Sequence, residues 1–261
     1  MQRLGVIGGT GLIKMTLGPQ INDAGFTLLR TDLVNVQTTW GEVPLTCMTL
    51  EKDGKTKELI FLQRHHNGEG VNKPPHTINH RANVMALKDS GCEAIMAVCS
   101  VGAIAHDFPP GKVGLAEQYI DFTGVASTFH DNEAVFTSVT EPFSSNLNSI
   151  LEVSLRESQK FDTQENLMYT YWLAQGPHFE TRAEINAIER LGGDMVGMTM
   201  PREAKLMREL ELPYVAVCIS SNWAAGREPG DSTADLHHHD VSSKANTRLG
   251  PVWDCLIKLL D

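Results

Sequence analysis

The side chains of this sequence that could carry out chemistry gather in five short clusters. They are Gly8–Gly11, Arg64–Glu69, Cys99–Gly102, Met198–Thr199 and Ser220–Ala224. Most of their members are glycines, hydroxyl residues, histidines, two amides and an arginine, which are the groups that bind anions and polar heterocycles. The clusters therefore predict a binding site for a charged small molecule.

The first two clusters have the composition of an anion site. A glycine-rich turn after a strand presents backbone N–H groups, to which Thr10 adds a hydroxyl. Arg64 offers a planar fork for phosphate oxygens, and His65 and His66 offer ring nitrogens. Taken singly, the two clusters also fit a plain tight turn and a solvated charged loop.

Two later segments suit the recognition of a heterocyclic base. Just before a predicted helix, Phe179 could stack on a base and Glu180 could accept its hydrogen bonds. Asn222 has an amide, which both donates and accepts hydrogen bonds. The alternatives are an acidic residue at a helix start for Glu180 and a turn residue for Asn222.

Two other kinds of site fit the sequence poorly. A GxGxxG dinucleotide fingerprint counted from Gly9 needs a glycine at position 14, where Lys14 stands. Histidines adjoin at 65–66 and 237–239, but no further ligands follow at a usual metal-site spacing. The sequence therefore predicts neither a nicotinamide cofactor nor a metal.

Alternating apolar strands and amphipathic helices set the expected fold class. Strands are predicted at 4–7, 59–62, 94–98, 195–198 and 214–220. Helices are predicted at 76–90, 183–191, 202–210 and about 240–260, the last one broken or kinked at Gly250-Pro251. This order predicts one α/β domain over residues 1–261, with a mixed, largely parallel twisted sheet flanked by helices.

The positions of the clusters relative to these strands predict that they meet. Each of the five clusters follows a predicted strand, and ligands of α/β folds collect beyond the carboxyl ends of strands. We therefore expect one shared site. The polar stretch Gly226–Asp240 is predicted to be a loop.

The composition excludes several classes of function. The 261 residues carry a formal net charge of −10, which argues against a nucleic-acid or anionic-membrane surface. Five cysteines without a CxxC pair indicate reduced core thiols, and no signal peptide or transmembrane segment is evident. We therefore expect a cytoplasmic location.

Taken in their order along the chain, these motifs resemble those of the purine nucleoside phosphorylase and methylthioadenosine phosphorylase family, in its trimeric branch. The resemblance runs from Val6 to about Val241. The matching segments are Ile7–Leu12, Arg64–His66, Asn79–Asn83, Val101–Ala103, Pro110–Val113, Gly176–Glu184 and Val196–Thr199.

The resemblance implies a phosphorylase-like fold and phosphate-dependent, reversible cleavage of the N-glycosidic bond of a purine nucleoside. The products would be the free base and ribose 1-phosphate. The implied phosphate-binding residues are Thr10, Arg64, His65 or His66, Ser100 and Thr199. Met198 would pack on the sugar, Phe179 near the base, and Asn222 would hold the purine N7 edge. Asn222, Arg64 and His65 are the expected catalytic residues.

The residues around the base predict a 6-oxopurine. An ionised Glu180 only accepts hydrogen bonds, which suits the N1–H of hypoxanthine or guanine and opposes the bare N1 of adenine. In the adenine-specific branch of the family, the loop after this strand has a sequence similar to Asp-Tyr-Asp. This chain has Asn222-Trp223-Ala224 at the matching positions. Ala224 thus replaces the carboxylate that would serve adenine.

The group at the sugar 5′ position stays open. His238 falls near the position of a family histidine that approaches a 5′-hydroxyl, which indicates inosine or guanosine. The early motifs Gly8–Gly11 and Arg64-His65 resemble the methylthio branch more closely. S-methyl-5′-thioinosine (or methylthioadenosine) phosphorylase is therefore the alternative.

The chain departs from the family pattern at two places, Cys99-Ser100 and Pro201. Because of these departures, a non-catalytic nucleoside-binding module is a distant alternative. A nucleosidase, which cleaves the same bond with water, is a further alternative. It would not need the complete set of anion-binding residues, so their presence argues against it. Inorganic phosphate is an expected co-substrate, and no cofactor, nucleic acid or membrane partner is expected. The resemblance implies a homotrimer, with a hexamer as the alternative.

Overall fold

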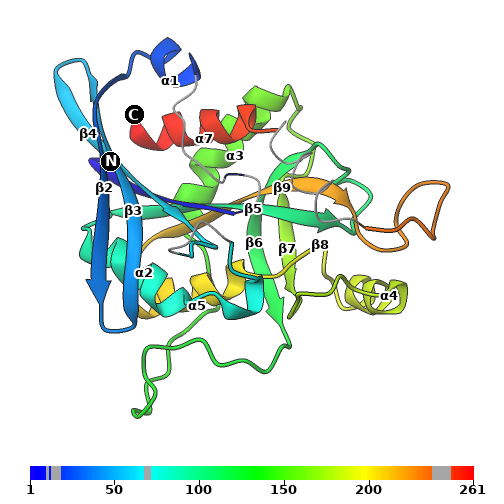
Figure 1. The fold of residues 1–261 in the computed structure, drawn as a ribbon. Helices are drawn as coiled ribbons and strands as arrows, with labels where there is room; N and C mark the ends of the chain where they lie inside the picture. Colours follow the sequence, from blue (N-terminus) through cyan, green and yellow to red (C-terminus); the bar gives the residue numbers. More distant parts are fainter. Residues whose placement is uncertain (10–11, 13–18, 68–71, 237–247) are drawn as a thin grey trace.

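A computed structural model describes the chain except for residues 10–11, 13–18, 68–71 and 237–247 (Figure 1). Its strands are β1 (Arg3–Gly8), β2 (Thr27–Thr38), β3 (Gly41–Lys52), β4 (Lys55–Gln63), β5 (Ala94–Ala103), β6 (Val113–Asp121), β7 (Met168–Leu173), β8 (Met195–Gly197) and β9 (Tyr214–Trp223). Its helices are α1 (Pro19–Asp23), α2 (His80–Asp89), α3 (Ser145–Gln159), α4 (Arg182–Arg190), α5 (Met200–Glu209) and α7 (Gly250–Leu260), with a 3₁₀ turn at Pro75–Thr77.

The strands form one mixed sheet in the order β2-β3-β4-β1-β5-β8-β7-β6-β9. Strand β5 also pairs in parallel with β9, so β5, β8, β7, β6 and β9 close on themselves into a ring. The β2-β3-β4 end is antiparallel, whereas β1 pairs in parallel with both β4 and β5. The expected α/β fold with a mixed sheet is confirmed.

Helices cover both faces of the sheet. In Figure 1, α3 and α7 lie on one side, and α2 and α5 lie on the other. The first layer buries Leu151 and Leu256 against Val6, and the second buries Leu87 and Met207 within a separate cluster. Because β5 and β9 are apolar over nearly their whole length, they can be buried between the two layers.

Two strands end later in the structure than the sequence predicts. The runs 94–98 and 214–220 were expected to end before their polar clusters, but β5 continues to Ala103 and β9 to Trp223. Backbone pairing between these neighbours carries both strands through the polar residues. In this part of the sheet, the predicted site residues therefore lie on strands and not on turns.

The closing helix also differs from its prediction. Gly250 and Pro251 do not break it, because they form the first turn of α7. Proline is tolerated there since the first N–H groups of a helix have no partner within it. The earlier part of the predicted helix, at 240–247, lies outside the described residues.

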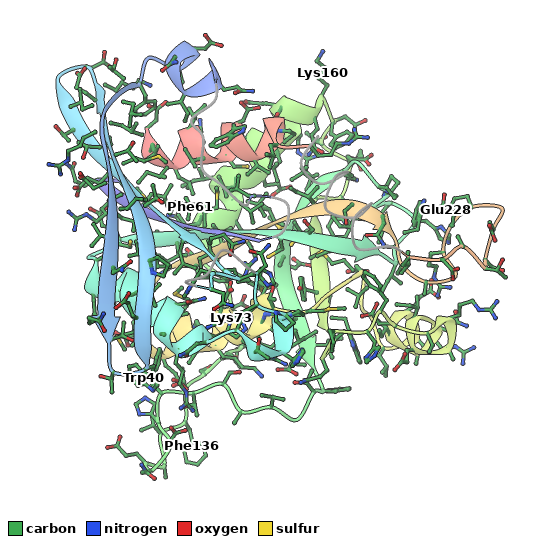
Figure 2. All side chains as sticks on the ribbon, viewed as in Figure 1. Trp40, Phe61, Lys73, Phe136, Lys160 and Glu228 are labelled. Atoms are coloured by element: carbon green, nitrogen blue, oxygen red, sulfur yellow. The ribbon has the colours of Figure 1, made fainter. Side chains whose placement is uncertain are left out.

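A long connection between β6 and α3 projects away from the body. It spans residues 122–144 and has no helix or strand. Phe136 lies near its far end (Figure 2) and is 93% exposed, and Phe122 is 73% exposed. This connection is the part of the described surface where large exposed aromatic side chains concentrate.

Candidate active site

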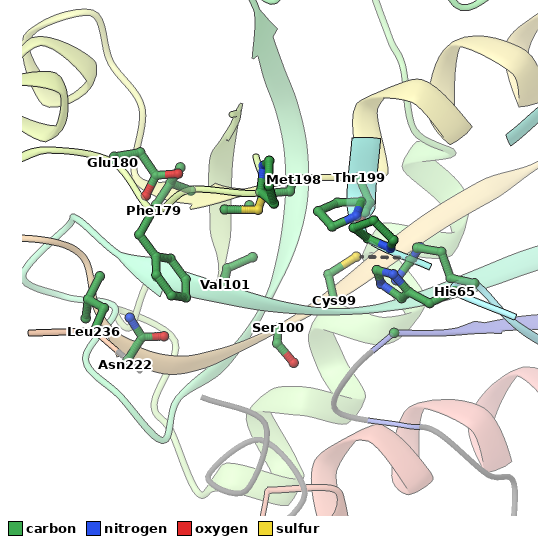
Figure 3. Close-up of a pocket in the computed structure, with 18 of the residues that line it drawn as sticks. His65, Cys99, Ser100, Val101, Phe179, Glu180, Met198, Thr199, Asn222 and Leu236 are labelled. Atoms are coloured by element: carbon green, nitrogen blue, oxygen red, sulfur yellow. Dashed lines mark hydrogen bonds between the residues drawn. The ribbon is translucent and has the colours of Figure 1, made fainter. Parts of the chain in front are cut away.

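A cavity of about 380 Å³ lies where β5, β8 and β9 meet the loops after β1, β4 and β7. Phe179, Glu180, Asn222 and Leu236 stand at one end of it, and His65, Cys99 and Thr199 stand at the other (Figure 3). Met198, Val101 and Ser100 lie between the two groups. The five sequence clusters are thus brought together, as their positions after strands predict.

The first glycine turn contributes Gly9 to the cavity wall, and Gly9 lies directly against Arg64. A Cβ atom added to Gly9 would be 2.6 Å from Nη1 of Arg64 and 3.2 Å from the carbonyl oxygen of Val98. No side chain fits at such distances. Glycine at this position therefore lets the guanidinium approach the turn.

Arg64 is held by a buried carboxylate that the sequence analysis did not single out. Its Nε lies 2.5 Å from Oε1 of Glu203 and its Nη2 lies 3.0 Å from Oε2, a bidentate ion pair. The Tyr214 hydroxyl donates to the same carboxylate over 2.9 Å. Both charged groups are buried, and the Arg64 charge holds the pKa of Glu203 well below its usual value against the effect of burial.

His80 is a second buried residue beside this pair. Its Nδ1 lies 3.7 Å from Oε1 of Glu203, too far for a hydrogen bond, and neither ring nitrogen has a hydrogen-bond partner. Burial lowers the pKa of His80. Neither His80 nor Glu203 has a place in the cavity lining; Glu203 acts on the site through Arg64, and His80 lies beside that ion pair.

Of the two histidines predicted to bind phosphate, His65 lines the cavity. Its Nδ1 lies 2.8 Å from the carbonyl oxygen of Lys73, which can only accept, so Nδ1 carries the proton. Burial and then the Arg64 charge lower the pKa of His65 to about 4. The ring is therefore neutral at pH 7, and Nε2 has a free lone pair.

His66 turns away from this arrangement. Its Nε2 lies 2.7 Å from Oδ1 of Asn83 on α2, and it has no place in the cavity lining. Between the two alternatives left open by the sequence, the structure brings His65 to the cavity and leaves His66 outside.

Two hydroxyl residues complete the described part of this end. Ser100 lies on β5, and its Oγ is buried without a hydrogen-bond partner in the described part of the chain. Thr199 precedes α5, and its side chain makes no capping bond to that helix. Both residues line the cavity, where their hydroxyls can donate to a ligand, and the first turn of α5 adds the partial positive charge of a helix start.

At the opposite end, the loop before α4 supplies Phe179 and Glu180. A capping box between Thr181 and Glu184 fixes the start of α4 and hence this loop. The Glu180 Oε1 atom is buried and has no donor among the residues that the structure describes, and burial raises the pKa of this carboxyl. Glu184, and not Glu180, is the acidic cap of the helix, which removes the alternative interpretation of Glu180.

Asn222 lies at the end of β9 with a defined orientation. One amide hydrogen goes to the carbonyl oxygen of Trp223 over 2.7 Å, which fixes the position of Nδ2. Oδ1 lies 2.8 Å from the Ser221 hydroxyl. One amide hydrogen is therefore left for a ligand. Ala224 also lines the cavity and is 2% exposed.

Met198 occupies the middle of the cavity. A Cβ atom on Gly176 would lie 2.7 Å from its sulfur.

The lining also includes residues that the sequence analysis did not single out, namely Asn72, Lys73, Pro74, Pro75 and Leu236. They follow no strand and form no motif, so nothing in the sequence pattern indicated them.

Two predicted site residues, Thr10 and His238, lie outside the described residues. Within the described part of the chain, no group of three His, Cys, Asp or Glu side chains could hold a metal ion. None of the helices placed by the structure combines the length and apolar character that a membrane span requires.

The fold and the cavity define an α/β protein whose site has a cationic and hydroxyl-bearing end, with Arg64 and Thr199, and an opposite end with Glu180 and Asn222. The family model described as the phosphorylase superfamily matches residues 37–257. A probable 6-oxopurine nucleoside phosphorylase from Thermococcus kodakarensis is 38% identical and is aligned over 89% of this chain and 84% of its own. A probable S-methyl-5′-thioinosine phosphorylase from Methanothermobacter thermautotrophicus is 35% identical, over 93% and 79%.

Solved structures agree on the fold. A methylthioadenosine phosphorylase from Schistosoma mansoni, in complex with adenine, superposes with a TM-score of 0.81 at 24% identity, covering 100% of this chain and 91% of its own. One from an antarctic soil metagenomic library gives 0.77 at 26% identity, over 98% and 85%. The chain belongs to the phosphorylase superfamily, and the expected enzyme class, a pentosyltransferase, is confirmed.

Proposed function

We propose that this protein cleaves the N-glycosidic bond of 6-oxopurine nucleosides with inorganic phosphate, releasing the base and ribose 1-phosphate. The observation that carries the proposal is the single cavity whose ends differ in chemistry (Figure 3). Arg64, His65, Ser100 and Thr199 lie toward one end, and Glu180 and Asn222 lie at the other. A nucleoside with its base at the second end would place its glycosidic carbon near Met198.

At the anion end, each group has a distinct role. Arg64 supplies charge, and Ser100 and Thr199 supply hydroxyl donors. Hydrogen phosphate retains one proton at neutral pH, and the free Nε2 lone pair of neutral His65 suits that hydroxyl. The anion is thus held with its unprotonated oxygens available for attack at the sugar carbon.

The reaction needs positioning and charge stabilisation more than a covalent nucleophile. As the base leaves, the sugar carbon becomes cation-like, and the adjacent phosphate stabilises it before forming the new bond. The remaining amide hydrogen of Asn222 can stabilise the negative charge that develops on the departing purine. Phosphate is the co-substrate in this scheme, and no cofactor takes part.

A 6-oxopurine fits the base end better than adenine does. The buried Oε1 of Glu180 lacks a donor, and the N1–H of hypoxanthine or guanine would provide one. The free amide hydrogen of Asn222 suits O6 or N7. Adenine would leave the carboxylate facing a bare N1, and Ala224 offers no carboxylate in compensation.

Methylthioinosine is the second candidate substrate. Relatives with 35% to 37% identity have the name S-methyl-5′-thioinosine phosphorylase, and the apolar Leu236 lines the cavity. His238, which would favour a 5′-hydroxyl, lies outside the described residues. Comparing nucleosides that have a 5′-hydroxyl with those that have a 5′-methylthio group distinguishes the two candidate substrates.

One assay tests the proposal. Inosine, guanosine, methylthioinosine, adenosine and methylthioadenosine are each incubated with the protein, with and without phosphate, and free base is measured. We expect release only with phosphate, and faster release from 6-oxopurine nucleosides. Release without phosphate, or no release at all, would contradict phosphorolysis. An unchanged base preference in Asn222→Asp would remove that residue's role.

We also propose a cytoplasmic homotrimer, with a hexamer as the alternative. The exposed Phe122 and Phe136 of the 122–144 connection support association, because aromatic side chains are enriched where subunits meet. Sedimentation velocity gives the state directly, and a purely monomeric species at micromolar concentration would contradict the proposal.

A further inference from the structure

Two cysteines lie side by side on adjacent strands next to the anion end of the cavity. Cys99 on β5 and Cys218 on β9 are partners in the parallel register. Neighbouring strands are about 4.8 Å apart, which falls within the Cα separations of about 4.4–6.8 Å that a disulfide spans. Both side chains belong to the same buried cluster, so they leave the sheet on the same face.

The two sulfurs differ in access and in contacts. Cys99 lines the cavity, and its Sγ lies 3.6 Å from Nη2 of Arg64, the hydrogen bond drawn at the Cys99 sulfur in Figure 3. Cys218 is fully buried behind it. A small molecule that enters the cavity can therefore reach Cys99 first.

The surroundings of Cys99 favour its thiolate. The neighbouring Cys218 thiol and the positive charge of Arg64 hold the pKa of Cys99 below its usual value, against the effect of burial. Burial, together with the neighbouring Cys99, raises the pKa of Cys218 well above its usual value. Cys99 is thus the nucleophile of the pair.

The other three cysteines provide an internal comparison. Burial raises the pKa of Cys92 to about 12 and raises that of Cys255 as well, and neither lines the cavity. Cys47 is half-buried on β3, and burial raises its pKa too. Cys99 alone among the five combines a place in the cavity lining, a cationic neighbour and a second cysteine as its register partner on the adjacent strand.

We propose that Cys99 is a site of oxidation by small hydroperoxides and that Cys218 resolves the product as an intramolecular disulfide. The Cys99 thiolate attacks one peroxide oxygen, the O–O bond breaks, and Cys99 becomes a sulfenic acid as hydroxide leaves. The Cys218 thiol then attacks the Cys99 sulfur, the S–O bond breaks, and water leaves with the thiol proton. One hydroperoxide is reduced, and two thiols are oxidised.

The disulfide would alter the anion end of the cavity. Cys99 at present offers sulfur as an acceptor to Arg64, and bonding to Cys218 draws that sulfur away from the guanidinium. The loss of phosphate affinity that follows rests on the proposed function. The oxidation itself rests only on the two strands, the cavity and Arg64.

The test is a peptide map of the native protein after treatment with dilute hydrogen peroxide. The chain is unfolded in the presence of N-ethylmaleimide, which blocks the remaining thiols, it is digested without reduction, and the peptides are identified by mass. We expect a Cys99–Cys218 cross-link that a thiol reductant reverses. Cys99 should oxidise at least about tenfold faster than Cys92 or Cys255.

Two variants separate the roles. In Cys218→Ser, Cys99 should stop at the sulfenic acid, which dimedone traps, and the cross-link should vanish. In Cys99→Ser, Cys218 should stay reduced at peroxide doses that oxidise the parent protein. Circular dichroism and a thermal melt before treatment show that both variants are folded.

The outcomes decide the proposal whether or not the protein is an active phosphorylase. Equal oxidation of Cys99 and Cys255, oxidation confined to Cys47, or a Cys99 that passes to the sulfinic acid without cross-linking would each overturn it. If the cross-link forms but nucleosides are not cleaved, the oxidation site stands and the proposed function fails.

Discussion

Nη1 of Arg64 lies 2.6 Å from the point that the Cβ of any residue other than glycine would occupy at position 9. The glycine turn therefore does more than present N–H groups to an anion. It leaves room for the buried guanidinium, which Glu203 holds from the opposite side. The end of the cavity that we propose binds phosphate thus depends on a glycine, an arginine and a glutamate that are far apart in the sequence.

Gly9→Ala tests this dependence. The added methyl group must displace Arg64 or the turn, and a misplacement of about 1 Å can cost about 100-fold in rate. We expect kcat/KM for phosphate to fall by about 10- to 100-fold, measured by base release at varied phosphate. Gly250→Ala is the control, since a Cβ there meets nothing within 4 Å. Parent-like kinetics in Gly9→Ala would contradict the steric argument.

Glu203→Gln tests the buried ion pair. Removing one charge leaves Arg64 buried without a counter-charge, which costs about 3–5 kcal/mol of unfolding free energy. Urea denaturation measures the loss. Asp32→Asn breaks an exposed pair with Arg30 and should cost less than about 1 kcal/mol. A similar loss of unfolding free energy in the two variants would contradict the prediction that burial makes the Arg64–Glu203 pair more costly to break.

The lowered pKa of His65 predicts a pH effect on stability. The unfolded chain binds this proton near pH 6.5, whereas the folded chain binds it near pH 4. Stability therefore falls as the pH drops from 6.5 towards 4, by up to about 1.4 kcal/mol per pH unit for this residue. His66 and His80 act in the same direction.

His65→Gln isolates that contribution. Its unfolding free energy should fall less between pH 7 and pH 5 than that of the parent protein, as measured by urea denaturation at both values. His65→Asn should behave in the same way, because neither amide titrates. A pH dependence identical to that of the parent would mean that folding leaves the pKa of His65 near 6.5.

Glu180→Gln tests the recognition of the base. An amide can donate to the bare N1 of adenine as well as accept from an N1–H, so the preference for inosine over adenosine should shrink by about tenfold or more. Competing-substrate assays measure the ratio. Glu184→Gln weakens the cap of α4 without facing the cavity and should keep the parent preference.

The sequence predicted the elements and much of the site because both left local patterns. Apolar runs marked β5 and β9, and the polar clusters beside them marked the cavity. Strand ends were placed too early at Cys99 and Ser220, since pairing between β5 and β9 continues through polar residues. Such pairing is a long-range contact that no local window contains.

The parts that escaped prediction share a physical cause. Glu203 acts on the cavity through Arg64, 139 positions away, and Lys73 contributes a backbone carbonyl to His65. Neither contribution depends on a motif. The wrong kink at Gly250 arose because proline breaks a helix in its interior but suits its first turn.

The division of the cavity between strands and loops has a consequence for divergence. Arg64, Ser100 and Thr199 sit in or beside the sheet, where a change disturbs the core, whereas Phe179, Glu180 and Leu236 sit on connections. Insertions or exchanges in those connections can change the preferred base while the phosphate chemistry stays intact. Chimaeras that swap residues 174–181 and 224–236 between relatives should therefore trade substrate range as a separable module.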